Sequence, residues 1–129
     1  MTLVHGGEQM TSTTSILNTV KKQIGFDEDY HAFDADLVLL INSALSVITQ
    51  VGVGPEEGYH IIGESGDWED LLGDDPRLDM VKEYVFLRAK VVFDPPQSSA
   101  VLQAYQERIR ELEWRSNIVA DDWGESKNG

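Results

Sequence analysis

Carboxylates are the side chains of this 129-residue sequence with the clearest capacity for chemistry. Asp79 with Glu83, and Glu107 with Glu111, have the spacing that places two acids on one helix face. Some all-α nucleotide pyrophosphatases hold magnesium with pairs of this kind. However, basic residues such as Lys82 share these helices and are expected to pair with the acids on a solvated face. A magnesium-dependent nucleotide pyrophosphatase therefore stays an alternative, because no second acidic pair completes the site.

The other candidates for metal or nucleophilic chemistry are scattered. His5, His31 and His60 lie in different segments, and no two have the i, i+4 spacing of a helical zinc site. The sequence has no cysteine, so it offers no disulfide, thiolate ligand or cysteine nucleophile. The acids at 27–36 lack the glycine and distal glutamate of a calcium loop, and the glycine-rich 52–55 lacks a following lysine. The sequence predicts no catalytic residue, no cofactor and no metal site.

Net charge limits the partners of this chain. Ten Lys and Arg residues against 23 Asp and Glu residues give a net charge of −13. Tight nucleic-acid binding is disfavoured, because it depends on basic side chains that neutralise phosphates. The charge is compatible with lying near DNA without binding it, and it also promotes solubility. The longest apolar run, Leu37 to Ile41, is too short to span a membrane.

The spacing of apolar residues predicts an all-α fold with four main helices. We expect these helices at about 15–24, 34–51, 75–93 and 98–116, with a short helix at 67–72 and room for an extended segment at 59–62. Gly25 is expected to end the first helix in a left-handed conformation, while Asp34 and Asp75 are expected as N-caps. Residues 1–14 are predicted to be a flexible arm, residues 15–118 a helical domain, and residues 119–129 a C-terminal tail.

The third main helix carries apolar residues on two faces. One stripe is formed by Leu78, Val81, Val85, Ala89 and Val92, and the other by Met80, Tyr84, Leu87 and Val91. A surface helix of a small domain needs only one apolar stripe. Either this helix is the central rod of the fold, or one face contacts another protein. We predict a subunit interface at the second stripe, Met80, Tyr84, Leu87 and Val91.

A second group of apolar residues lies near the C-terminus, where little chain remains to bury it. It consists of Trp114, Ile118, Val119 and Trp123. Tryptophan is enriched among the residues that anchor interfaces. For Trp114 alone, packing on the chain's own core is an equal alternative. For the group, we predict a docking surface for a partner.

The order of these features resembles the small helical head–tail connector (adaptor) proteins of long-tailed bacteriophages. The resemblance covers residues 15 to about 118, starting with the short helix Ser15 to Ile24. It continues with ADLVLLINSALSVITQVGV from Ala35, the Gly/Pro loop, WEDLL at Trp68 to Leu72, LDMVKEYVFLRAKVVFDPP from Leu78, and LQAYQERIRELEWR from Leu102. The FDPP break followed by a helix with ELE is moderately specific in this combination.

The resemblance implies a virion structural protein without catalytic activity, assembled in the host cytoplasm. It implies a ring of about twelve subunits beneath the portal protein, which extends the channel for double-stranded DNA. DNA would pass through without tight binding, and a tail-side stopper or tail-completion protein would bind the other side. The resemblance assigns portal docking to the C-terminal group, and a tail-side or neighbouring contact to the loop from Gly52 to Gly66. The alternative of another class is an acidic helical interaction module or DNA-mimic inhibitor, which would be a monomer or dimer.

Overall fold

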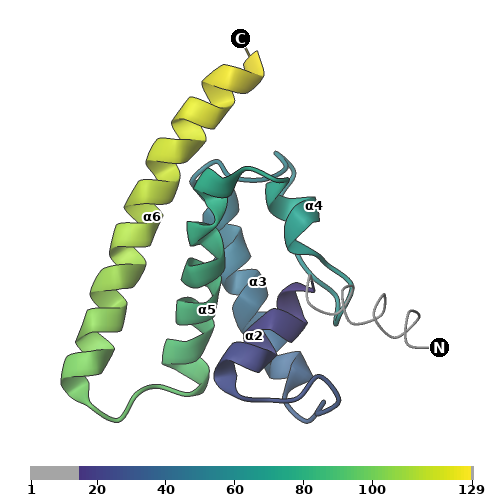
Figure 1. Cartoon of the computed structure of the whole chain (residues 1–129), viewed down its shortest axis with the longest axis vertical. Helices are drawn as coiled ribbons and strands as arrows, with labels where there is room; N and C mark the ends of the chain where they lie inside the picture. The colour runs from purple at the N-terminus through teal and green to yellow at the C-terminus, as the bar shows by residue number, and fades with distance from the viewer. Residues whose placement is uncertain (1–14, 129) are drawn as a thin grey trace.

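The computed structural model describes residues 15–128, and their side chains as far as residue 121. The predicted arm, 1–14, and the side chain of Trp123 lie outside the described residues. The described chain is all-α, as predicted, and no strand occurs within it apart from isolated bridges. Its elements are α2 (Ile16–Ile24), α3 (Asp34–Gln50), α4 (Trp68–Leu72), the 3-10 turn η1 (Pro76–Leu78), α5 (Met80–Phe93) and α6 (Ser99–Asn128) (Figure 1).

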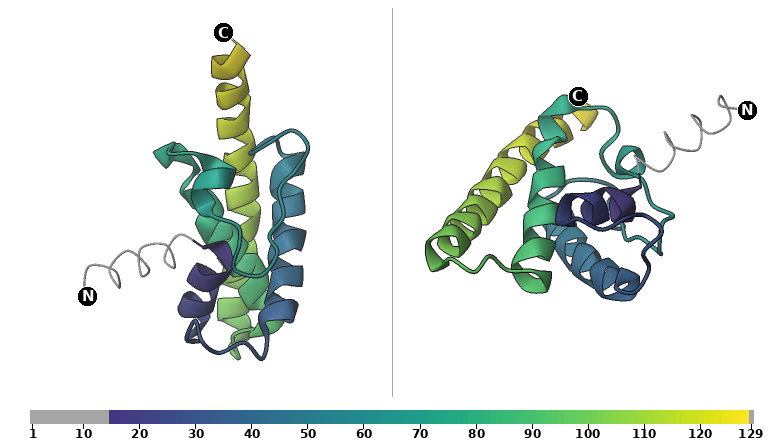
Figure 2. Two further views of the ribbon diagram at one scale, coloured as in Figure 1. Left: turned by 90° about the vertical axis from the view of Figure 1, so that its right-hand side faces the viewer. Right: turned by 60° about the horizontal axis from the view of Figure 1, so that its bottom comes forward.

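Helix α5 forms the middle layer of the bundle. It packs against α3 on one side and α6 on the other, and α2 lies beside α3 (Figure 2). Most of both apolar stripes of α5 is therefore covered: Val81, Val85 and Ala89 from the first, and Tyr84 and Leu87 from the second, are buried, whereas Val92 at the end of the first stripe is 64% exposed. The two-faced pattern of this helix marks the central rod of the fold.

The ends of α2 form as the sequence predicts. The Ser15 hydroxyl accepts a hydrogen bond from the Asn18 backbone N–H at 3.3 Å, which satisfies one free donor of the first turn. Gly25 has a φ of +116°, and the Phe26 N–H donates to the Lys21 carbonyl at 2.8 Å. This is the left-handed helix end in which the following apolar residue folds back onto the bundle.

The predicted N-cap of α3 is wrong. Asp34 is the first residue of α3, Phe33 precedes it, and no side chain caps the helix. One Asp34 carboxylate oxygen lies 2.9 Å from the Nζ of Lys21, and the other lies 2.8 Å from Nδ1 of His31. The carboxylate is thus engaged by a buried ammonium group and an imidazole instead of by the backbone N–H groups at the helix end.

The third main helix begins differently from the prediction. Asp75 does cap its start, by accepting the Arg77 N–H at 2.9 Å. The first residues, Pro76–Leu78, form a separate 3-10 turn, and the α-helix begins at Met80. The helix ends at Phe93, just before the Asp94-Pro95-Pro96 break, as predicted.

Helix α6 is much longer than predicted. It continues to Asn128 instead of ending near Ser116, and no proline interrupts it. Its inward face continues at helical spacing through Ile109, Leu112, Ser116 and Ala120, all of which are buried. Near Ala120 the turn after α3 approaches so closely that a Cβ at Gly52 would lie 3.3 Å from the Ala120 Cβ. The later part of α6 therefore packs against this turn.

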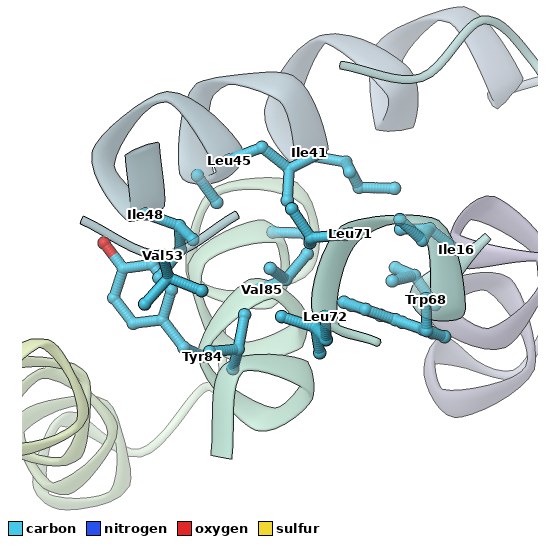
Figure 3. Close-up of a cluster of buried hydrophobic side chains, with 14 of the residues drawn as sticks. Ile16, Ile41, Leu45, Ile48, Val53, Trp68, Leu71, Leu72, Tyr84 and Val85 are labelled. Carbon is cyan, nitrogen blue, oxygen red and sulfur yellow. The ribbon is translucent and has the colours of Figure 1, made fainter. Parts of the chain in front are cut away.

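Helix α4 closes the open side of the core. Its Leu71 and Leu72 point toward side chains of α3 and α5, and Trp68 lies against Ile16 of α2 (Figure 3). The Trp68 indole N–H donates to the Thr19 hydroxyl at 2.9 Å. None of the described helices is long and apolar enough to cross a lipid bilayer.

Candidate docking surfaces

Helix α6 is fixed to α5 by charge as well as by apolar contact. The Arg108 guanidinium donates to both Glu83 carboxylate oxygens, at 2.7 and 2.9 Å. These bonds stabilise the ionised carboxylate and hold the pKa of Glu83 below its ordinary value, against a smaller opposing effect of burial. A two-bond pair of this kind fixes orientation as well as distance.

A polar network joins the three long helices beside this ion pair. Tyr84 of α5 is fully buried, and its hydroxyl donates to Glu113 of α6 at 2.7 Å. Arg88 donates to the same hydroxyl at 2.7 Å and to Ser43 of α3 at 3.4 Å. Burial, followed by the bond to Glu113, raises the pKa of Tyr84, so the phenol stays protonated and keeps donating. The network sets the position of α6 relative to the rest of the bundle.

The outer edge of α6 carries the predicted docking residues. Trp114 is 67% exposed and Ile118 is 43% exposed, although neither is polar. Both line a shallow groove of about 310 Å³ between α6 and the end of α3, with Val51, Arg110, Glu113 and Asn117. The core alternative for Trp114 is therefore not realised in this subunit. Val119 is partly buried and packs on the core instead.

The predicted subunit-interface residues of α5 lie mainly inside the subunit. Tyr84 is fully buried, Leu87 is 5% exposed, and Met80 and Val91 are partly buried at the edges of the core. Packing within one subunit is thus enough to explain this apolar stripe. A contact with a second subunit stays a prediction, and in this arrangement only Met80 and Val91 are accessible for it.

The acids of the alternative magnesium site have other partners. Glu83 binds Arg108, and Asp79 lies 3.7 Å from the Nζ of Lys82. Glu111 lies within ion-pair distance of both Arg108, at 3.3 Å, and Arg115, at 3.5 Å. Among the described side chains, no three His, Asp or Glu residues are arranged to hold a metal ion. Asp79, Glu83 and Glu111 are therefore parts of ion pairs, and Glu107 accepts a hydrogen bond from Gln103 at 3.3 Å.

An aromatic cluster at the opposite end of the bundle was missed in the sequence. Phe26, Tyr30 and Phe33 come from the loop between α2 and α3, and Phe93 ends α5. Their ring centroids lie 5.3 to 6.0 Å apart. The signal was the recurrence of aromatic residues every three or four positions in this acidic segment. Tyr30 is 46% exposed and Phe33 is 39% exposed.

Charge is distributed unevenly over the molecule. Residues 23–76 include more than half of the 23 acids of the chain and no Lys or Arg. This stretch forms the α2–α3 loop, α3, the long loop after it and α4. A hollow of about 420 Å³ beside α4 is lined in part by Glu69, Asp74 and Asp75. One side of the bundle is therefore strongly negative, whereas α5 and α6 contain most of the basic residues.

Comparison with known proteins agrees with this architecture. A family model described as "Phage connector protein" matches residues 16–122, which span α2 to α5 and the part of α6 that holds Trp114 and Ile118. No curated protein and no solved structure matches the chain. The resemblance inferred from the sequence is confirmed: the chain belongs to the phage connector protein family, a family of head–tail connectors.

Proposed function

We propose that this connector forms a ring beneath the portal protein, joins the capsid to the tail side, and extends the channel for DNA. The observation that carries the proposal is the position of α6. This helix extends beyond the rest of the bundle at its C-terminal end (Figure 1), and Trp114 and Ile118 lie exposed along it. A helix held rigidly at its base, with apolar residues exposed above, is suited to insert between parts of a partner.

The proposed portal contact uses the outer edge of α6. Trp114 and Ile118 are its accessible members, Val119 supports them from the core side, and Trp123 lies farther along the same helix. Arg110 borders the groove and adds a cation beside the apolar residues. Tryptophan and arginine are the residues most often found to dominate binding energy at interfaces.

The ring is proposed as a cyclic, head-to-tail assembly of about twelve copies. In such an assembly each subunit uses two different surfaces, and closure of the ring leaves neither of them free. Met80 and Val91 are the residues of the second α5 stripe that a neighbour can reach. The net charge of −13 per chain suits a channel wall, since DNA phosphates are repelled and do not adhere.

Electron microscopy of the purified chain, alone and mixed with the portal protein of its own phage, tests the proposal. We expect rings stacked on the portal. Trp114→Ala/Ile118→Ala should weaken portal binding by about 2 kcal/mol or more, since both side chains are removed from the proposed contact. The matched control is Val92→Ala. It truncates a 64% exposed apolar residue near the C-terminal end of α5, outside the proposed contact.

Three outcomes would contradict the proposal. Monomers or dimers that ignore the portal at high concentration would favour the acidic interaction module. Equal loss of portal binding in Val92→Ala and in the α6 variant would show that the edge of α6 is not the contact. A rise in thermal stability with magnesium would point instead to the hydrolase alternative.

A further inference from the structure

The end of the bundle opposite the C-terminus presents an exposed aromatic surface. We call it the aromatic end, and define it as Phe26, Tyr30, Phe33 and Phe93. The loop between α2 and α3 and the turn between α5 and α6 lie side by side there (Figure 1), and Phe93 packs edge-on against both Phe26, at 5.9 Å, and Phe33, at 5.3 Å. Tyr30 and Phe33 expose enough ring surface for a partner to contact.

A buried cation holds this loop in place. The side chain of Lys21 has no solvent exposure, yet its Nζ donates to the Glu28 carbonyl at 2.9 Å and lies 2.9 Å from the Asp34 carboxylate. Burying an ammonium group is costly unless it is fully paired, so the loop is anchored by an interaction that a simple linker does not need. The aromatic rings are therefore presented in a preformed arrangement, which reduces the entropy lost on binding.

The rim of the aromatic end carries unneutralised negative charge. The carboxylates of Asp27, Asp29 and Asp36 are exposed, and no cation of the described chain lies within ion-pair distance of them. The lysines at this end are already paired, Lys22 with Glu28 at 3.4 Å and Lys90 with Asp94 at 2.8 Å. Exposed rings surrounded by free carboxylates complement a cation that also has a flat face.

We propose that the aromatic end docks an arginine-bearing segment of the tail-side protein. The assignment to the tail side rests on the proposed function, because portal docking at α6 leaves this end facing the other way. A guanidinium stacks on an aromatic ring while its N–H groups bind carboxylates. Lysine has no planar group to stack, so arginine is the better fit.

Chemical-shift mapping of the full chain with a hexa-arginine peptide tests this assignment. We expect the largest shifts at residues 26–36 and Phe93, and weaker binding of hexalysine. Tyr30→Ala/Phe33→Ala and Asp27→Asn/Asp29→Asn/Asp36→Asn should each weaken hexa-arginine binding about fivefold or more. The second variant leaves every aromatic contact intact, so it keeps the test valid if the first one unfolds.

The control removes the same number of charges elsewhere. The control variant is Glu69→Gln/Asp70→Asn/Asp74→Asn, near α4. Each substitution removes a charge and keeps the length of the side chain. This variant should leave hexa-arginine binding unchanged within about twofold, apart from the small effect of net charge. The proposal is overturned if this control weakens binding as much as the other variants, or if the shifts concentrate at residues 56–79. Shifts at the aromatic end that grow with protein concentration alone would overturn it in favour of a second copy.

The outcome is separable from that of the proposed function. Ring formation and portal binding are measured by microscopy on the same variants, and we expect both to match the wild type. Absence of wild-type rings would contradict the ring proposal while leaving the peptide mapping interpretable. Normal rings without hexa-arginine binding at residues 26–36 would overturn only the inference about the aromatic end.

Discussion

At the scale of single residues, the structure depends on a few polar groups with several partners each. Lys21 holds a loop from inside the protein, Arg108 holds α6 on α5, and Tyr84 connects Arg88 and Glu113. Water can solvate Glu83, which is 42% exposed, if Arg108 is removed, whereas removal of the fully buried Lys21 leaves its partners without compensation. The cost of such a loss exceeds the net value of the bond itself.

Lys21→Met tests the buried anchor. It removes the cation beside Asp34 and leaves the Glu28 carbonyl without its donor, so we expect a loss of about 3 kcal/mol in the free energy of unfolding. Lys22→Met, at a side chain that is 53% exposed, should change stability by less than about 0.5 kcal/mol. Urea denaturation followed by circular dichroism measures both.

The double variant Lys21→Met/Asp34→Asn separates the cost of the unpaired Asp34 carboxylate from the cost of losing the Lys21 hydrogen bond to the Glu28 carbonyl. It removes the uncompensated carboxylate together with the cation, so it should be more stable than Lys21→Met alone. Equal stability of Lys21→Met and Lys22→Met would contradict the assignment of Lys21 as an anchor.

The ion pair between Glu83 and Arg108 predicts a specific pH dependence. Arg108 lowers the pKa of Glu83 in the folded state, so the pair contributes stability above the ordinary pKa of 4.5 and loses it as the pH falls through the lower folded value. Glu83→Gln should therefore lower the melting temperature at pH 7, and its difference from wild type should shrink below about pH 4.5. A difference that stays constant from pH 7 to pH 3 would contradict this account. Glu107→Gln, at a carboxylate that lies within ion-pair distance of no described cation, is the control.

At the scale of elements, local signals predicted the helices, and tertiary contacts decided their ends. The caps at Ser15, Gly25 and Asp75 follow from residue type and form as expected. The length of α6 did not follow, because the contact of Ala120 with the turn at Gly52 joins residues far apart in the sequence. Aspartate is likewise a common N-cap residue, but Asp34 instead forms an ion pair with the buried Lys21 of α2.

The proposed docking surfaces could be predicted from the sequence less completely than the fold. The exposure of Trp114 and Ile118 was predicted because too little chain follows them to provide a cover, while their docking role stays a prediction. The second stripe of α5 was ambiguous, since a helix covered on both sides by its own subunit and a helix with a free interface share one sequence pattern. The aromatic end was missed because its rings come from two loops that only the fold brings together.

The contact between Gly52 and α6 can be tested with one matched pair of substitutions. Gly52→Ala introduces a Cβ 3.3 Å from Ala120 at a φ of +102°, whereas Gly25→Ala introduces one at +116° with nothing within 4 Å. Both suffer the backbone penalty of a left-handed conformation. We expect Gly52→Ala to cost about 1 kcal/mol more, because α6 must also shift. Chemical denaturation measures the difference, and hydrogen exchange at residues 116–121 should rise only in Gly52→Ala.

At the scale of the whole molecule, charge and exposed apolar surface are distributed unevenly. Among the exposed large apolar side chains, Trp114 and Ile118 lie along α6 and Tyr30 and Phe33 lie at the aromatic end, while Leu39 and Ile62 are exposed on α3 and in the loop after it. The side formed by α3, its following loop and α4 is rich in acids, since residues 23–76 contain more than half of the 23 acids and no Lys or Arg. A protein that connects two partners along one axis needs two separate contacts, and we expect the edge of α6 and the aromatic end to supply them.

The net charge leads to a prediction about assembly. Copies with a charge of −13 repel one another, so we expect the contacts of the proposed ring to be mainly apolar and to overcome this repulsion. Raising sodium chloride from about 0.05 M to about 0.5 M shortens the Debye length and should shift the chain toward rings. Sedimentation velocity at a fixed protein concentration measures the shift. Sucrose at equal osmolality is the control, because it strengthens apolar contacts without screening charge.

The opposite result would change the account of the ring. If salt dissociates the rings, neighbouring copies are held by ion pairs, and the negative side of one subunit must meet the Arg residues of α6 in the next. Arg110→Gln would then reduce assembly at low salt, since Arg110 is exposed and lies within ion-pair distance of no described acid. With apolar contacts dominant, Arg110→Gln instead leaves ring formation unchanged at both salt concentrations, because it removes no buried apolar surface.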